Sequence, residues 1–104
     1  MRRPFVAGNW KMNLDLPSAR ALVAELCRGV GSSPSLDIAV CPPTVYLIPV
    51  AQALQGAPVR LGAQNCWHEP KGAFTGEVSP AMVKETGCTY VILGHSERRH
   101  TIGP

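Results

Sequence analysis

The chain has 104 residues and lacks any concentrated run of positive charge. Ten Lys and Arg stand against seven Asp and Glu, which leaves a formal charge of +3. The basic residues are spread along the sequence, and no basic block is longer than the pairs Arg2-Arg3 and Arg98-Arg99. Because nucleic-acid surfaces are built from clustered cations, we predict no nucleic-acid partner.

A long apolar run is also missing. Arg2 and Arg3 resemble the charged start of a signal peptide, but Asn9, Lys11 and Asn13 interrupt the stretch that follows them. We therefore predict no export signal, no membrane span and no membrane partner. We expect a cytoplasmic protein.

Closely spaced cysteines do not occur either. Cys27, Cys41, Cys66 and Cys88 lie far apart and contain no C-x-x-C pair. Such spacing is typical of reduced thiols in a cytosolic protein. A zinc site made from these cysteines and His68 would require distant segments to meet, so no metal site is predicted.

The sequence does contain an alternation of apolar, β-rich runs with segments of helical periodicity, and no composition break marks a linker. This order predicts one α/β domain over residues 1–104, because a βαβ series forms a parallel sheet with right-handed crossovers. If no strand is skipped, the sheet order follows the chain and every strand ends at the same rim. The expected strands are 5–7, 36–41, 59–63 and 90–93, the expected helices are 17–30, 49–54 and 80–86, and a long loop spans 64–79.

Two polar motifs directly follow the first and last of these strands. The first is Gly8-Asn9-Trp10-Lys11-Met12-Asn13, and the second is Gly94-His95-Ser96-Glu97-Arg98-Arg99. An amide, an ammonium, an imidazole and a carboxylate at strand ends suit proton transfer on a small anionic substrate. Lys11 and His95 would stand about 14 Å apart along a flat sheet. Only a strongly curved sheet, as in a barrel wall, would bring them together.

These motifs resemble triosephosphate isomerase, as do Gly62-Ala63-Gln64-Asn65 and Gly72-Ala73-Phe74-Thr75-Gly76-Glu77. The resemblance runs through the chain without a gap. It implies the first four strands of a (β/α)8 barrel, or about two-fifths of a typical barrel of ~250 residues. It also implies interconversion of dihydroxyacetone phosphate and glyceraldehyde 3-phosphate through an enediolate, without a metal or an organic cofactor.

The resemblance assigns a role to each polar residue. His95 would be neutral and polarise the substrate carbonyl. Lys11 would place a fixed positive charge beside the substrate oxygens and phosphate, and Asn9 would donate a hydrogen bond to the carbonyl side. Glu97 would keep Lys11 in place. The general base and the phosphate loops of the family belong to later strands, beyond Pro104.

The resemblance further implies a homodimer. The loop at 64–79 would reach into the neighbouring subunit, where Thr75 would approach the catalytic lysine and asparagine. Phe74, Gly76 and Glu77 would accompany it, and Arg98 would pair with Glu77. The alternative is that the loop packs on its own chain.

Other interpretations stay open. Taken singly, Asn9 is an ordinary turn former and Lys11 a solvated amine. His95 is then a hydrogen-bonded core or cap histidine, and Glu97 a surface carboxylate. A chain with these strands alone would be inactive, and its open edges would lead it to self-associate or to pair with the missing half of the barrel. It could instead be a non-catalytic half-barrel module that binds another protein. A flavodoxin-like binding domain is disfavoured, since no G-x-G-x-x-G follows the first strand.

Overall fold

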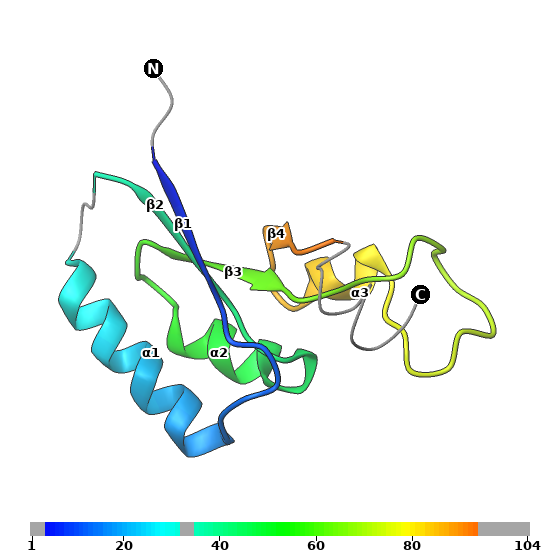
Figure 1. The fold of residues 1–104 in the computed structure, drawn as a ribbon, viewed down its shortest axis with the longest axis horizontal. Coiled ribbons are helices and arrows are strands. Elements are labelled where there is room, and N and C mark those ends of the chain that lie inside the picture. The colour runs from blue at the N-terminus through cyan, green and yellow to red at the C-terminus, as the bar shows by residue number, and fades with distance from the viewer. Residues whose placement is uncertain (1–3, 32–34, 94–104) are drawn as a thin grey trace.

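The computed structural model describes residues 4–31 and 35–93, and these form a curved parallel sheet with helices between its strands (Figure 1). The sheet order is β1-β2-β3-β4 and each neighbouring pair is parallel. Both features confirm the sequence prediction. The elements are β1 (Phe5–Asn9), α1 (Leu16–Val30), β2 (Asp37–Cys41), a 3-10 turn η1 (Thr44–Tyr46), α2 (Leu47–Ala53), β3 (Val59–Ala63), α3 (Pro80–Glu85) and β4 (Tyr90–Val91).

Helix α1 begins one residue before the predicted Pro17, because Asp15 caps it. Asp15 Oδ1 accepts the backbone N–H of Ser18 at 2.9 Å, and Ser18 Oγ accepts the backbone N–H of Asp15 at 3.1 Å. This reciprocal pair satisfies N–H groups that have no acceptor inside the helix. The side-chain and backbone hydrogen bonds from Ser18 lower the pKa of the Asp15 carboxyl. The cap therefore stabilises α1 at neutral pH, and this contribution is lost as pH falls through the lowered pKa.

For the two shorter helices, the sequence predicted a start at a proline. Pro80 begins α3 as predicted, and Ser79 Oγ accepts the Met82 N–H at 3.2 Å. The predicted start of α2 at Pro49 is wrong by two residues, since the helix begins at Leu47 after the turn η1. Proline is tolerated at the third position because the N–H there has no intrahelical acceptor.

The outer strands also differ from prediction in their bounds. β1 continues past Ala7 to Asn9, which pairs with Cys41, and the next N–H, of Trp10, donates to the Cys41 carbonyl at 3.1 Å. β4 ends at Val91, although the Ile92 N–H still donates to the Ala63 carbonyl at 2.8 Å. Asn9 is thus the last residue of a strand and is positioned by its ladder.

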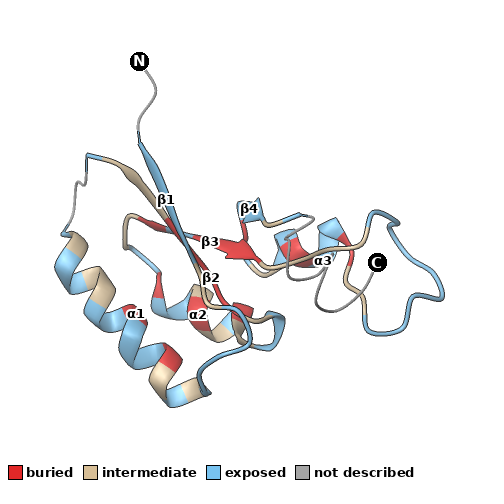
Figure 2. Ribbon diagram, in the orientation of Figure 1, coloured by how far each residue is buried: buried red, intermediate tan, exposed pale blue. Residues whose placement is uncertain are grey.

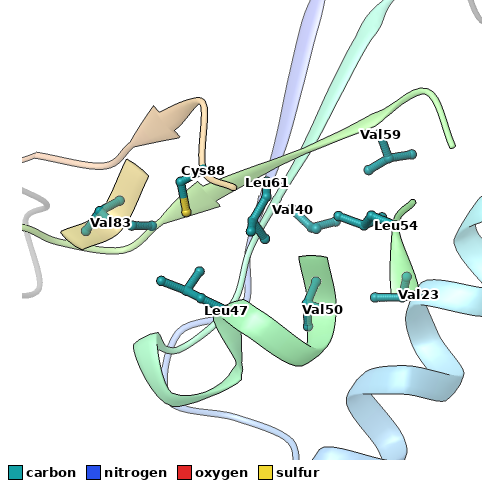
Figure 3. Packing of buried hydrophobic residues seen from close by; sticks show 10 residues of the cluster. Val23, Val40, Leu47, Val50, Leu54, Val59, Leu61, Val83 and Cys88 are labelled. Atoms are coloured by element: carbon teal, nitrogen blue, oxygen red, sulfur yellow. The ribbon is translucent and has the colours of Figure 1, made fainter. Parts of the chain in front are cut away.

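The convex face of the sheet forms the hydrophobic core with the helices (Figure 2). Figure 3 shows Val40 and Leu61 of the sheet facing Leu47 and Val50 of α2, and Val23 of α1 beside them. Burial of these apolar side chains is the main source of stability for this layer. The buried cluster contains Val23, Val40, Leu47, Val50, Leu54, Val59, Leu61, Ala63, Val83 and Cys88.

The concave face curls strongly and carries Gly62 beside Cys41. Side chains alternate along a strand, so Cys41, Gly62 and Tyr90 share this face through their pairing. The rings of Phe5 on β1 and Tyr90 on β4 lie 4.9 Å apart between centroids. In a flat sheet these strands would be separated by three strand spacings, about 14 Å. The observed contact confirms the curvature of a barrel wall rather than a flat, doubly wound sheet.

Gly62 is required by this curvature. A Cβ on Gly62 would lie 2.7 Å from Cys41 Sγ and 3.4 Å from Tyr90 Cβ. We expect Gly62→Ala to destabilise the protein by roughly 1–3 kcal/mol, because the buried thiol has little room to move. Chemical denaturation measures this loss. The double variant Cys41→Ala/Gly62→Ala should recover part of it, and Gly29→Ala, which meets nothing within 4 Å, should not destabilise. Equal losses for Gly62→Ala with and without Cys41 would contradict the argument.

Candidate active site

Asn9 and Lys11 stand where β1 reaches the carboxyl rim of the sheet. Asn9 Oδ1 accepts the backbone N–H of Lys11 at 2.9 Å. Lys11 has a φ of 57°, in the left-handed region that side chains with a Cβ rarely occupy. Asn13 Nδ2 donates to the Trp10 carbonyl at 2.9 Å, which closes the same turn. The loop after β1 is therefore a defined structure built by its own amide side chains.

Gln64, the first residue after β3, links this loop to the rest of the rim. Its Nε2 donates to the Lys11 carbonyl at 2.7 Å and to the Cys41 carbonyl at 2.9 Å. A similar bond lies further along the loop, where Tyr46 Oη donates to the carbonyl of Leu14 at 3.0 Å. Side chains that follow β2 and β3 thus attach the loop that follows β1.

The chemistry available at this rim is electrostatic. Lys11 supplies an ammonium group. The side-chain amide of Asn9 supplies a donor, Nδ2, which makes no hydrogen bond to a described residue. A cation and an amide N–H at one rim suit an anionic or carbonyl oxygen. Cys41 is nearby in the ladder, but burial, and secondly the Cys88 thiol, raise its pKa, so it stays a neutral thiol rather than a nucleophile.

The structure brings together only part of the predicted site. Asn9 and Lys11 lie together at the rim, as the sequence predicted. His95, Glu97 and Arg98 lie outside the described residues, so their approach to Lys11 and Glu77 stays a prediction. No role could be predicted for Gln64, because its two bonding partners precede it by 53 and 23 positions and no local pattern indicates them.

The loop at 64–79 extends away from the sheet (Figure 1). It has an internal structure. The Trp67 and Phe74 ring centroids lie 5.1 Å apart, and the backbone N–H of Trp67 donates to the Val78 carbonyl at 2.7 Å. At its base, Asn65 Nδ2 donates to Glu77 Oε1 at 3.2 Å. Thr75 and Gly76 are exposed in the turn that the Glu77 N–H closes on the Phe74 carbonyl at 2.9 Å. Four of the five predicted interface residues, Phe74, Thr75, Gly76 and Glu77, thus lie in a loop with a defined internal structure.

In residues 4–31 and 35–93, no group of three or more His, Cys, Asp or Glu is placed to bind a metal ion. All four cysteines fall within these ranges and are free thiols. None of the helices described there is long and apolar enough to cross a membrane.

A parallel βα sheet that curls about its inner face, with polar groups at its carboxyl rim, defines the class of (β/α) barrel proteins. The strands seen here correspond to the first four βα units of such a barrel.

Within this class, the family model of triosephosphate isomerase matches residues 4–104, and the chain belongs to that family. It is similar to the triosephosphate isomerases of Rhodopirellula baltica (51% identity over 102 residues, 98% of this chain and 40% of the relative) and Carboxydothermus hydrogenoformans (53% over 103 residues, 99% and 41%). That of Herpetosiphon aurantiacus is 52% identical over 103 residues. The chain spans about two-fifths of the length of these curated relatives.

Proposed function

We propose that the protein containing this chain interconverts dihydroxyacetone phosphate and glyceraldehyde 3-phosphate through an enediolate, without a metal or an organic cofactor. The observation that carries the proposal is the rim of β1. There, Lys11 has an unusual backbone conformation, and its backbone N–H donates to Oδ1 of the Asn9 amide. Membership of the triosephosphate isomerase family supports the same reaction.

Each residue of the site contributes a different charged or polar group. Lys11 stabilises the negative charge that develops on the substrate oxygens and attracts the phosphate. Asn9 Nδ2 donates to the carbonyl side while its Oδ1 bonds the Lys11 N–H. His95 polarises the carbonyl as a neutral imidazole, and Glu97 keeps Lys11 in place. The glutamate base and the phosphate-binding loops come from later strands of the barrel.

Replacing Lys11 tests this assignment in the whole protein. Lys11→Met removes the charge and keeps much of the side-chain volume, so kcat/KM for glyceraldehyde 3-phosphate should fall about 100- to 1,000-fold or more. Lys84→Met, at an exposed lysine of α3, is the matched control and should keep native kinetics. A coupled isomerase assay measures both. Native turnover by Lys11→Met would exclude the proposed role.

We also propose a homodimer in which the loop at 64–79 docks on the partner. The loop is exposed, internally bonded and extended from the sheet, as a docking element should be (Figure 1). Thr75 then approaches the Asn9 and Lys11 region of the other subunit, and Phe74, Gly76 and Glu77 contribute to the interface. Arg98 pairs with Glu77 and stabilises the base of the loop.

A cation introduced at the loop turn tests the homodimer. Thr75→Arg would face the partner's lysine, so sedimentation velocity should show a shift toward monomer, with a loss of activity that is largest at low protein concentration. Thr89→Arg places the same side chain at an exposed threonine where β4 starts and should leave the dimer intact. A Thr75→Arg protein that sediments as the native dimer would refute the docking model.

The described sheet has two open edges, since β1 pairs only with β2 and β4 only with β3. Its edge strands expose Phe5 (49%) and Val6 (54%), and Leu93 (66%) follows β4. We expect a polypeptide of residues 1–104 expressed alone to self-associate or to bind the remaining barrel strands. Sedimentation should show species larger than a monomer, and an apolar dye should become fluorescent. A monodisperse monomer with low dye binding would count against this.

A further inference from the structure

The loop after β1 contains two residues in an unfavourable backbone conformation, and each is bonded by a side chain from elsewhere. Lys11 has a φ of 57° and Leu14 a φ of 76°, although neither is glycine. The carbonyl of Lys11 accepts Gln64 Nε2 at 2.7 Å, and the carbonyl of Leu14 accepts Tyr46 Oη at 3.0 Å. A strained conformation persists only when its surroundings fix it, and these two bonds lie where the strain is.

We propose that Gln64 is a positioning residue for Lys11. The two hydrogens of its amide go to two carbonyls, one on Lys11 and one on Cys41. The Cys41 carbonyl is already fixed, because it also accepts the Trp10 N–H at 3.1 Å. Gln64 therefore ties the Lys11 carbonyl to the end of β2. Asn9 Oδ1 bonds the N–H on the other side of the same residue at 2.9 Å.

The consequence concerns the direction in which the Lys11 side chain leaves the backbone. With both peptide units of Lys11 bonded, its Cα–Cβ bond has one orientation at the rim, and the ammonium group starts from a fixed point. An electrostatic catalyst gains most when its charge is in place before the reaction begins. This inference rests on the proposed function, in which Lys11 acts on the substrate, and it extends that function to a residue that touches no substrate.

The residue type fits this task. A carboxylate at position 64 would face two carbonyl oxygens without a hydrogen to donate, and a methionine would fill the space without either bond. Gln64→Met is therefore the informative change, since it removes both donors at nearly constant volume. Tyr46→Phe is the matched control, because it removes the corresponding bond to the other left-handed residue, Leu14. Gln52→Met, on the exposed face of α2, controls for the substitution itself.

The experiment uses the whole protein, with isomerase kinetics and crystal structures of the variants. In Gln64→Met, kcat/KM should fall about ten- to a hundredfold, as expected for a misplaced catalytic group, and Lys11 should leave the left-handed region. Tyr46→Phe and Gln52→Met should stay within about twofold of native kcat/KM. In a Lys11→Ala background, Gln64→Met should cause little further loss, because its effect passes through Lys11.

Each result decides the proposal. Native kcat/KM in Gln64→Met, an unchanged Lys11 φ, or an equal loss in the Lys11→Ala background would overturn it. A drop in Tyr46→Phe as large as that in Gln64→Met would also overturn it, because the loss would then reflect general loosening of the loop. If the native protein shows no isomerase activity, the proposed function fails, and the Lys11 φ in Gln64→Met still decides whether Gln64 positions this residue.

Discussion

The structure depends on the curvature of one parallel sheet. On the convex face, Val40, Val59 and Leu61 pack against the helices. On the concave face, Gly62 leaves room for the Cys41 thiol, and any larger residue would meet that sulfur. The absence of a side chain at Gly62 lets β2, β3 and β4 approach on the inside of the bend, in addition to the natural twist of the sheet. The contact of Phe5 with Tyr90 across the inner face is a direct result.

The arrangement of the loops at the carboxyl rim follows from this bend. Because the strands are parallel and curled, the loops after β1, β2 and β3 come close enough for single side chains to connect them. Gln64 bonds the loop after β1 and the last residue of β2 with one amide group, and Tyr46 bonds Leu14. In a flat sheet the same residues would lie farther apart, because β1 and β3 would be separated by two full strand spacings. The geometry of Lys11 thus involves contacts set by the fold as well as the local bonds of Asn9 and Asn13.

The sequence was sufficient to predict the order of the elements and the parallel sheet, since apolar runs and helical periodicity are local signals. Element bounds depended on contacts that those signals do not carry. Asp15 starts α1 through Ser18, and Pro49 lies inside α2 rather than at its start. At the site, Asn9 and Lys11 could be singled out by their place after a strand. The bonds of Gln64 could not, because they join residues that are distant in the sequence, and no local pattern indicated the left-handed conformation of Lys11.

The side chain of Asn9 shows why an amide belongs at the end of β1. Its oxygen is occupied by the Lys11 N–H, so it stabilises the turn that places the lysine. Its nitrogen makes no hydrogen bond to a described residue and is the atom that the proposed function assigns to the substrate. An aspartate would preserve the first role and lose the second, and it would also place a negative charge where the proposed substrate binds. A serine could accept or donate but has no second polar atom to divide between the two tasks. The structural and the chemical interpretations of Asn9 therefore require the same residue, and each uses a different atom of it.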